Sequence, residues 1–588
     1  MKQNSLKFEL FDLCIFTNFC RKKGLFFFFF AEINTIPVLF RDHISEKGTS
    51  STKAKYLLPI PYHQSPITNP HSPFPTHHSP FPNLHSSNDV ITASALPCKI
   101  GFGCKIDSMS ATINILFLAA EAEPFVKIGG LADVAGSLPL ALRALPVQAT
   151  RGIRLDVRLV LPLHRAIHLE ATTLRPVAEF SVYRRGGNIP VQVFEMSSDG
   201  MPVYFINGDP LSSSLSVYSS DLAADREKYA FFSLAAFELA RHLGWQPDIV
   251  HANDWHTALA LYALRTRPDP LQAPLHTVFT VHNLPYMGGD GSDVLSAYGL
   301  MPLNDDSLPK WAQTQPLPLG LWSADVIVPV SPSYAREILT PELGCGLDPY
   351  LKTRTNSMTG ILNGLDVNSW NPETDQTLKA RFTADELPAR AVNKTALQKA
   401  LELKQDARVP LLVMIGRIDQ QKGLDITFEA LRQMTDRSWQ FVILGSGDPE
   451  LENAARSLQA DFPDRARAVI RYDAALGRLL YGGADMFLMP SRYEPCGLAQ
   501  MIAMRYGCVP VVRATGGLKD TVQEGKTGFL FQEAVAGSML EALERALTVY
   551  ARPEKWQHFQ RNGLKEDFSW PRSARQYANI YRSLVSGS

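Results

Sequence analysis

The stretch that decides the fold is SATINILFLAAEAEPFVKIGGLADVAGSLP, residues 110–139. It opens with a short apolar run, Ile113 to Ala120, of the kind that forms a strand buried in a parallel sheet. A glycine pair and a segment of small residues follow, as at a turn from a strand into a helix. This order predicts that ordered structure starts near Met109 and begins with a strand, a glycine loop and a helix.

The same alternation continues to the C-terminus and predicts an α/β fold with parallel sheets. A second unit of strand, glycine pair and helix occurs at ATGGLKDTV, residues 514–522. Its recurrence in the second half predicts two Rossmann-like domains that face each other across a ligand-binding cleft. A third glycine loop, LGSGDP at residues 444–449, is expected to line that cleft. The strand-like runs are VRLVLPL, DIVHA, TVFTVHN, DVIVPVS, LLVMIGR, FVILGSG, MFLMPS and VPVVRA.

The composition excludes several classes of protein. The 588 residues include 58 basic and 58 acidic side chains, so the net charge is zero, and 45% are hydrophobic, as in globular proteins. Zero charge gives no electrostatic reason to expect nucleic acid or an anionic membrane as a partner. The seven cysteines, without a CxxC pair, indicate neither a disulfide framework nor a zinc site. No apolar stretch reaches the roughly 20 residues that a membrane helix needs.

Residues 1–108 differ from the rest of the chain. They hold four of the cysteines and six of the histidines, and the repeat HSPFPTHHSPFPNLHS at residues 71–86 has no helical or strand period. We expect this prefix to be disordered and dispensable, with Met109 as the true initiator. RKKGLFFFFF at residues 21–30 is too short and too far from Met1 for a signal peptide. A cytoplasmic location is expected, with a plastid as the alternative if the prefix is a transit peptide.

The first glycine loop, KIGGLADVAGSLP, is a candidate phosphate site. Lys127 stands where the strand ends, and Gly129 and Gly130 let backbone approach a ligand near a helix N-terminus. An ordinary strand-to-helix turn is the alternative. The loop is not GxGxxG, and no GxxxxGKS occurs, so neither a dinucleotide-binding fold nor a P-loop is supported.

Histidines and charged residues also follow predicted strands. His256 in HANDWHT and His282 in TVHN are candidates for contacts with substrate hydroxyls, although a lone histidine is more often structural. Arg417 and Lys422, in GRIDQQKGLD, could neutralise a diphosphate without a metal ion. A solvated basic turn is the alternative for this pair.

The motif PSRYEPCGLAQ supplies a carboxylate after another strand. Glu494 could accept hydrogen bonds from sugar hydroxyls or stabilise developing positive charge, and a helix cap is its alternative role. Cys496 is expected to pack beside the site, because no catalytic Cys/His/Asn arrangement can be assigned.

Together these motifs, with ILNGLD and the late DFSW, strongly resemble the bacterial glycogen synthase and plant starch synthase family over essentially all of residues 109–588. The resemblance implies the GT-B fold. It implies a retaining hexosyltransferase that moves glucose from ADP-glucose to the non-reducing end of an α-1,4-glucan. It implies no cofactor, no metal, no nucleic acid and no membrane.

The resemblance also implies roles for individual residues. Lys127 would contact the nucleotide sugar, Gly129 and Gly130 its phosphates, and His256 and Asn363 the glucosyl unit. Arg417 and Lys422 would contact the distal phosphate and Glu494 the glucose ring. Thr515, Gly516, Gly517 and Leu518 would offer amides to phosphate. In this family the leaving ADP oxygen is thought to help deprotonate the acceptor hydroxyl.

Three segments depart from the family pattern. Residues 315–318 read QPLP where an NFLK-type segment is usual, Asp225 to Tyr229 replaces a DNxxRF-like helix start, and Arg478 stands where a histidine is usual. These departures concern acceptor contacts and cleft closure rather than the donor motifs.

The expected domains are a prefix at 1–108, a catalytic domain at 109–363, a nucleotide-sugar domain at 364–567 and a final helix at 568–588 that packs back on the first domain. A hinge is expected near Asn363. Three alternatives stay open: UDP-glucose as donor, another GT-B glycosyltransferase such as a sucrose-related enzyme, and a catalytically silent glucan-binding protein.

Overall fold

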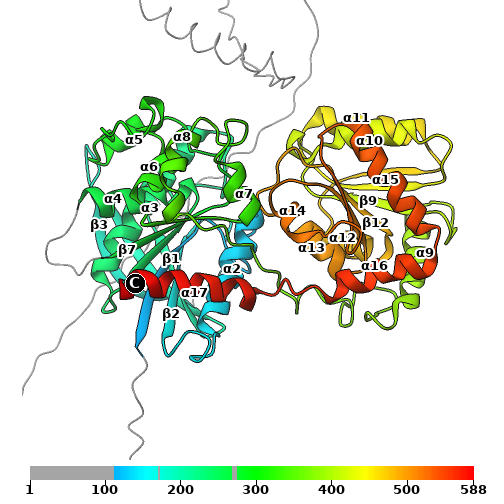
Figure 1. Ribbon diagram of the computed structural model, residues 1–588. Coiled ribbons are helices and arrows are strands. Elements are labelled where there is room, and N and C mark those ends of the chain that lie inside the picture. The colour runs from blue at the N-terminus through cyan, green and yellow to red at the C-terminus, as the bar shows by residue number, and fades with distance from the viewer. Residues whose placement is uncertain (1–110, 168, 170–172, 268–274, 588) are drawn as a thin grey trace, which may run out of the picture. The chain divides into compact units, whose positions relative to one another are not determined.

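The computed structural model describes residues 111–587, except 168, 170–172 and 268–274. The predicted disordered prefix, 1–108, lies outside the described residues. The described chain forms two sheets in succession, each with helices around it (Figure 1). The predicted α/β class with parallel sheets is confirmed.

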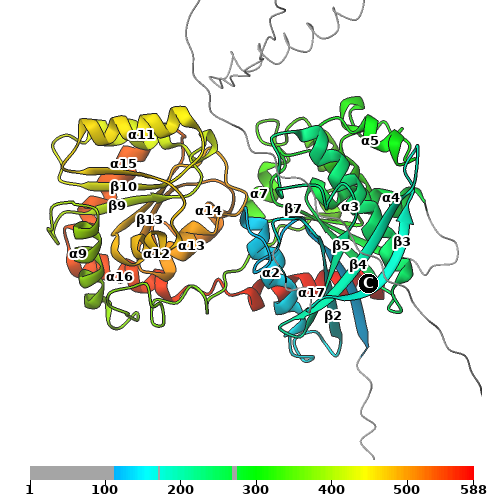
Figure 2. The same cartoon turned by 180° about the vertical axis from the view of Figure 1, so that it is seen from behind.

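The first sheet has eight strands in the spatial order β3-β4-β5-β2-β1-β6-β7-β8. Five neighbouring pairs, from β5-β2 to β7-β8, are parallel, whereas β3-β4 and β4-β5 are antiparallel and extend one edge (Figure 2). The strands are β1 (Thr112–Leu118), β2 (Arg154–Pro162), β3 (Arg175–Val182), β4 (Ile189–Ser198), β5 (Met201–Asn207), β6 (Ile249–Asn253), β7 (His276–Val281) and β8 (Val326–Pro329).

The helices that accompany this sheet begin with α2, directly after the glycine loop. They are α2 (Gly130–Arg143), α3 (Leu222–His242), α4 (Trp255–Thr266), α5 (Ser292–Ala297), α6 (Pro316–Ser323), α7 (Pro332–Glu337) and α8 (Asp348–Thr353), with the short 3-10 turns η2 (Lys310–Ala312) and η3 (Thr355–Ser357).

The second sheet has six parallel strands in the order β11-β10-β9-β12-β13-β14. Its strands are β9 (Leu411–Ile415), β10 (Gln440–Gly445), β11 (Ala466–Ile470), β12 (Met486–Met489), β13 (Val509–Arg513) and β14 (Phe529–Phe531). Its helices are α9 (Arg390–Ala400), α10 (Leu424–Gln433), α11 (Pro449–Asp461), α12 (Ala474–Gly483), α13 (Ala499–Arg505), α14 (Gly516–Thr521), α15 (Ala536–Tyr550) and α16 (Pro553–Lys565), with the 3-10 turns η4 (Leu387–Ala389) and η5 (Gln420–Lys422).

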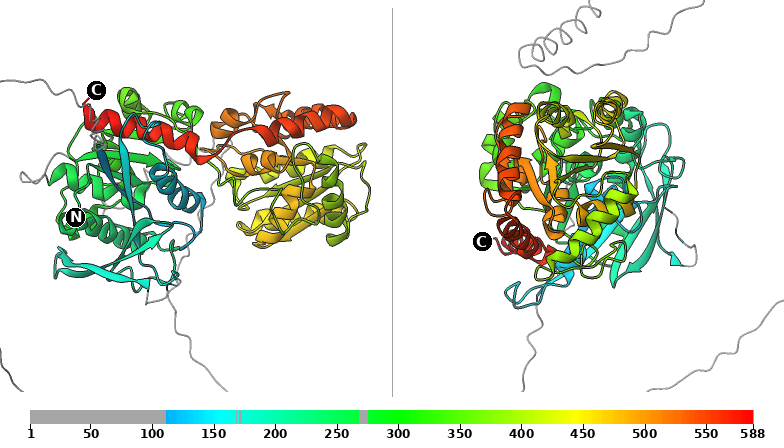
Figure 3. Two further views of the ribbon diagram at one scale, coloured as in Figure 1. Left: turned by 90° about the horizontal axis from the view of Figure 1, so that it is seen from below. Right: turned by 90° about the vertical axis from the view of Figure 1, so that its right-hand side faces the viewer.

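Alternate residues of each central strand enter different cores, because successive side chains of a strand point to opposite faces. In β9, Leu412 and Met414 pack with α10, α11 and α15, whereas Leu411 and Val413 face α9, α12 and α13. Both faces are therefore apolar, and helices cover both (Figure 3). Each large side chain buried in this way contributes roughly 1.5–3 kcal/mol, which explains the nearly continuous apolar runs of the sequence.

The last helix, α17 (Trp570–Ser586), packs against α2 and β1 of the first sheet (Figure 1, red). Trp570, Tyr577 and Tyr581 enter the same core as Phe117 of β1. The segment that leads into α17 runs beside the segment after Asn363, where the Leu365 amide donates to the Phe568 carbonyl at 2.7 Å. The chain thus returns to the first sheet beside the place where it left it.

Candidate active site

The first group of candidate residues lies where β1 and β6 end side by side. The chain passes from β1 to β2 on one side and later reaches β6 on the other side of β1. Ligands of doubly wound sheets bind outside the carboxyl ends of the strands at such a reversal of strand order. The glycine loop follows β1 and the HANDWHT motif follows β6, so both motifs lie at this reversal point.

The Glu121 carboxylate holds the glycine loop through two backbone amides. Its carboxylate accepts hydrogen bonds from the Ile128 amide at 2.5 Å, from the Gly129 amide at 3.1 Å and from the Tyr218 hydroxyl at 3.0 Å. A Cβ on Gly129 would lie 3.3 Å from Glu121 Oε1, whereas one on Gly130 would meet nothing within 4 Å. Burial raises the pKa of Glu121, against the opposing effect of these amides. The amide of Gly129 is therefore occupied within the protein, while Gly130 borders open space.

Lys127 is half-exposed and paired with two acids. Its Nζ lies 2.7 Å from Asp133 Oδ1 and 3.1 Å from Glu123 Oε2. Burial by itself would lower the pKa of Lys127, but the bonds to the two carboxylates outweigh it and raise the pKa. The lysine is thus charged and held over the start of α2.

His256 is a buried, neutral imidazole. Burial lowers its pKa well below the usual value, and the nearby Lys228 ammonium adds to this effect. Its ring centroid lies 5.0 Å from that of Tyr218 and 4.6 Å from that of Tyr229. Its Nδ1 is buried without a hydrogen-bond partner among the described residues, and such an unpaired group costs about 1–3 kcal/mol. This buried nitrogen is therefore available to a hydroxyl group of a ligand.

Asp254 ties the ends of β6 and β7 together. Its backbone has φ 55°, in the left-handed region that non-glycine residues rarely adopt. Its carboxylate accepts from the His282 amide at 2.7 Å, and His282 Nε2 lies 3.0 Å from Asn253 Oδ1. Burial raises the pKa of Asp254 to about 7 and lowers that of His282 to about 3. His282 is therefore neutral and engaged in holding the turn.

The second group lies at the corresponding reversal of the second sheet, where β9 is flanked by β10 and β12. Lys422, after β9, places its Nζ 2.7 Å from Oε2 of Glu494, which follows β12. The Ser491 hydroxyl donates to the same oxygen at 3.0 Å. The side chains of Lys422 and Glu494 are 20% and 7% exposed. This ion pair is the most desolvated charge arrangement among the predicted site residues.

Arg417 lies on the open side of the same loop. Its side chain is 60% exposed and pairs with Asp419 at 3.3 Å. Asp419 also accepts from the Lys422 amide at 3.1 Å, and Gly423 follows with a left-handed φ of 68°. This turn leaves one partly buried and one accessible cation a few residues apart.

The glycine turn before α14 packs on the backbone of the EPCGL motif. The Gly517 amide donates to the Glu494 carbonyl at 3.0 Å. A Cβ on Gly516 would lie 1.9 Å from that carbonyl oxygen, and one on Gly517 would lie 2.1 Å from the Cys496 carbonyl oxygen. Only glycine fits this approach, so the pair fixes the position of Glu494.

The other polar groups of this turn are also engaged. The Gly516 amide and the Thr515 hydroxyl donate to the Glu337 carboxylate, the amide at 2.8 Å. The Leu518 amide donates to the Thr515 carbonyl at 3.1 Å. A phosphate that used the Gly516 amide would have to displace Glu337.

Asn363 and Cys496 are buried close together. The Asn363 side-chain oxygen has no hydrogen-bond partner in the described chain. Burial raises the pKa of Cys496 to about 12, although the backbone amide of Asn363 opposes the shift. A neutral, buried thiol is not a nucleophile, which agrees with the expected packing role.

The structure thus assembles the predicted residues as two sets. Gly129 and His256 are linked through Glu121 and Tyr218, and Lys422 contacts Glu494 directly. Within residues 111–587 as described, neither Lys127 nor His256 hydrogen-bonds to Lys422 or Glu494.

Four residues of these sets were absent from the sequence prediction. Glu121 follows the first strand directly, so its strand-end position could have identified it. Asp254 and Ser491 stand inside recognised motifs. Tyr218 lies in a serine-rich loop that carries no pattern, and only the tertiary structure brings it to Glu121.

Arg478, in one of the three segments that depart from the family pattern, has a structural role. It donates to Asp375 Oδ2 at 3.0 Å, and its guanidinium lies 4.2 Å from the centroid of the Trp370 ring. It therefore fastens the segment after Asn363 to α12. Residues 316–323 form α6, so the prolines of the QPLP segment begin a helix.

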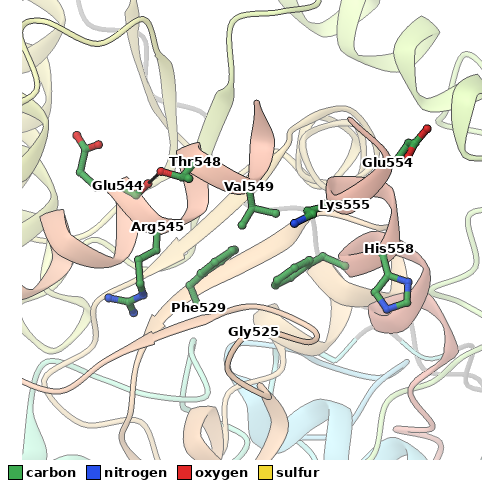
Figure 4. A pocket seen from close by; sticks show the side chains of 10 residues that line it. Gly525, Phe529, Glu544, Arg545, Thr548, Val549, Glu554, Lys555 and His558 are labelled. Carbon is green, nitrogen blue, oxygen red and sulfur yellow. Dashed lines mark hydrogen bonds between the residues drawn. The ribbon is translucent and has the colours of Figure 1, made fainter. Parts of the chain in front are cut away.

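A cavity of about 810 Å³ lies elsewhere, between α15 and α16. Figure 4 shows Phe529 among charged side chains that include Arg545 and Lys555. The rings of Phe529 and Phe559 stack with their centroids 5.0 Å apart. None of the predicted site residues lines it. Volume alone therefore does not identify the site.

Two further features are absent from the described part of the chain. No group of three or more His, Cys, Asp or Glu side chains there could hold a metal ion. No helix there is long and apolar enough to cross a membrane.

Comparison with known proteins gives consistent matches along the chain. Residues 114–353 match the starch synthase catalytic domain, and residues 397–565 match glycosyl transferases group 1. A glycogen synthase of Syntrophotalea carbinolica is 41% identical over 80% of this chain and 99% of its own length. One of Thermotoga maritima is 39% identical over 81% of this chain and 99% of its own length.

Solved structures agree. The catalytic domain of starch synthase IV from Arabidopsis thaliana, bound to ADP and acarbose, has a TM-score of 0.72 at 33% identity and covers 81% of this chain and 100% of its own. A sucrose-phosphate synthase from Thermosynechococcus elongatus, with a TM-score of 0.53 at 20% identity over the same shares, shows the shared fold alone. The resemblance inferred from the motifs is confirmed: the chain belongs to the glycogen synthase and starch synthase family and is a glucosyltransferase with the GT-B fold.

Proposed function

We propose that this enzyme transfers glucose from ADP-glucose to the non-reducing end of an α-1,4-glucan, glycogen or starch, with retention at the anomeric carbon. The glycogen synthase relatives, aligned over nearly their whole length, support a glucan acceptor. The ADP bound to the related starch synthase supports adenine rather than uracil in the donor.

The observation that carries the proposal is the partly buried ion pair of Lys422 and Glu494 at the reversal of the second sheet, 2.7 Å apart. An ammonium has three donors, so Lys422 can keep its bond to Glu494 and also meet a phosphate oxygen. Arg417, 60% exposed on the same turn, supplies a second cation. Together they would stabilise the charge that develops on a departing diphosphate.

The reaction breaks the bond between the anomeric carbon and the diphosphate oxygen, and the electron pair leaves with ADP. The acceptor hydroxyl forms the new glycosidic bond on the same face, and its proton passes to the leaving phosphate oxygen. Glu494 would stabilise the positive charge of the sugar ring during this exchange. The chain needs no nucleophile for these steps, and Cys496 is unsuited to be one.

The first half would orient the donor sugar. Lys127 and Gly130 would face the nucleotide sugar, and the neutral ring of His256 would hydrogen-bond to a glucose hydroxyl through a buried nitrogen that now lacks a partner. Asn363, whose side-chain oxygen is also unpaired, would serve the same unit. Of the amides from Thr515 to Leu518, that of Gly516 would contribute only after Glu337 has moved away from it.

We also propose that the chain divides at Asn363 into a catalytic domain, 109–363, and a nucleotide-sugar domain, 364–567, with 568–588 returning to the first. Hinge closure at this boundary would exclude water, which otherwise competes with the acceptor. Small-angle scattering with and without ADP should then show compaction, and an unchanged radius of gyration would argue against closure.

The test of the function uses purified protein with ADP-glucose and a glycogen primer. We expect ADP release above a boiled control and new α-1,4 linkages in the product. No release of ADP, with an intact and folded protein, would refute the proposal. Competition between ADP-glucose and UDP-glucose decides the donor, and linkage analysis separates a glucan product from that of another glycosyltransferase.

A further inference from the structure

Tyr218 lies buried between the two candidate motifs of the first sheet. Its hydroxyl donates to Glu121 Oε1 at 3.0 Å, and its ring centroid is 5.0 Å from that of His256. Glu121 in turn accepts from the amides of Ile128 and Gly129 in the glycine loop. One tyrosine thus contacts both the acid that holds this loop and the neutral histidine.

The hydroxyl of Tyr218 completes the coordination of a buried carboxylate. Glu121 is 1% exposed, and no lysine, arginine or histidine of the described chain forms an ion pair with it. A buried charge without a counter-ion depends on its hydrogen bonds. Removing one of its three donors should therefore loosen the remaining bonds to the loop.

The segment that carries Tyr218 has no regular structure of its own. It reads SSSLSVYSSD, residues 212–221, and it connects β5 to α3. Side chains of α3 hold it on both sides of the tyrosine. Lys228 Nζ donates to the Val217 carbonyl at 2.6 Å, and Asp225 accepts from the Ser219 amide at 2.8 Å.

Lys228 and Asp225 also form an ion pair of 2.7 Å, and their side chains are only 2% and 5% exposed. A buried ion pair adds little net stability, although removing one partner is strongly destabilising. Such a pair is better explained by what it positions. Here it holds the residues before and after Tyr218 and so keeps the Tyr218 hydroxyl within hydrogen-bond distance of Glu121.

We propose that Tyr218 is a positioning residue for the sugar-nucleotide donor: its hydroxyl, held in place by Lys228 and Asp225, orients Glu121 and thereby the loop from Lys127 to Gly130. The inference rests on the proposed function, because the loop has this importance only if it binds the donor.

The main test is Tyr218→Phe, which keeps the ring beside His256 and removes only the hydroxyl. Loss of one hydrogen bond to a charged group should raise the KM for ADP-glucose about tenfold, with kcat within about twofold of the wild type. The matched control is Tyr262→Phe, because that buried hydroxyl donates to the Met301 carbonyl at 2.7 Å, outside this network. Its KM should stay at the wild-type value.

A second variant tests the path through the carboxylate. Glu121→Gln offers one acceptor oxygen where the carboxylate offers two, so it should also raise the KM for ADP-glucose. Because both changes act on one unit, the double variant should be no worse than Glu121→Gln alone. Fully additive effects would overturn the proposed path.

The outcomes separate the two proposals. An active wild type whose KM is unaltered by Tyr218→Phe overturns the positioning role, and so does a lower melting temperature with no change in KM. A folded wild type without turnover refutes the proposed function instead. In that case ADP affinity measured by calorimetry still tests the inference, and equal affinities of the wild type and Tyr218→Phe overturn it.

Discussion

The two sheets share the same reversal of strand order at their candidate sites, but they manage charge in opposite ways. At the end of β1, Glu121 is buried without an ion-pair partner among the described residues and depends on backbone amides and a tyrosine. At the end of β12, Glu494 is buried against the ammonium of Lys422. The histidines beside Glu121 are neutral, whereas a second cation, Arg417, stands beside the ion pair.

The same strand arrangement can therefore support two kinds of site, one that orients a sugar and one that stabilises a diphosphate. Hydrogen-bonded, uncharged surroundings suit the orientation of sugar hydroxyls, and preorganised positive charge suits a diphosphate. If the assignment is right, changes at the second sheet should mainly affect the chemical step. Changes at the first sheet should mainly affect donor binding and stability.

The largest effect is expected for Glu494→Gln. The change keeps the shape but removes the charge that faces Lys422, and kcat should fall by about 10²–10³. Initial rates of ADP release measure it. Glu544→Gln, which removes a carboxylate paired with Arg437 on the surface, is the control and should leave kcat unchanged. A Glu494 variant with wild-type kcat would contradict the contrast between the sheets.

The two cations of the second sheet should differ in size of effect. Lys422→Met should lower kcat/KM about a hundredfold and also reduce stability, because it leaves Glu494 buried without its partner. Arg417→Met should lower kcat/KM about tenfold with little change in melting temperature, since its side chain is 60% exposed. Steady-state kinetics together with thermal unfolding separate these results, and equal losses of stability would be inconsistent with the structure.

The pH dependence of the free energy of unfolding tests whether Asp254, at the first sheet, is buried without a charge. Burial raises the pKa of Asp254 to about 7, above its usual value, so the native state retains a proton that the unfolded state has lost. The contribution of this group is therefore full below about pH 4 and is lost as pH rises to about 7. The slope is up to about 1.4 kcal/mol per pH unit.

Urea unfolding of the wild type and Asp254→Asn at a series of pH values checks this expectation. Taking the difference between the two proteins removes the opposite trend from His251 and His282, whose depressed pKa values favour unfolding in acid. The wild-type free energy of unfolding should fall relative to the variant between pH 4 and 7. A constant difference would disprove the shift.

The smallest effects are expected for the glycine pair of the first loop. Gly129→Ala places a methyl group 3.3 Å from Glu121 and should cost about 1 kcal/mol of stability. Gly130→Ala meets nothing within 4 Å, so stability should hold while the KM for ADP-glucose rises. Chemical unfolding and kinetics of both variants measure this. The reverse pattern would exclude a ligand over Gly130.

Much of the fold could be predicted from the sequence, because strands buried on both faces need long apolar runs. All eight quoted runs lie in or overlap strands, from VRLVLPL in β2 to VPVVRA in β13. The antiparallel edge of β3, β4 and β5 was not predicted. β3 and β4 are partly exposed, with polar residues between the apolar ones, so no continuous run marks them, whereas β5 is a buried, mostly apolar strand that was not recognised.

The candidate site was predictable only in part. Lys422 and Glu494 are recognisable because each follows a buried strand, and the sheet order brings these strand ends together. The partners of the glycine residues were not predicted. The Gly129 amide bonds to Glu121, which its strand-end position could have identified. The Gly516 amide bonds to Glu337, 179 positions away in the sequence, and this contact depends on tertiary packing that local sequence does not encode.

The position of helix α17 determines when the core of the first sheet can close during synthesis. Its Tyr581 hydroxyl lies 2.7 Å from Nδ1 of His251, a residue 330 positions earlier, and Trp570 and Tyr577 fill the core under β1. The second sheet can close its own core while synthesis continues. The first sheet, although made earlier, keeps an uncovered apolar strip until the final helix emerges. Its native core therefore closes only after α17 has been synthesised.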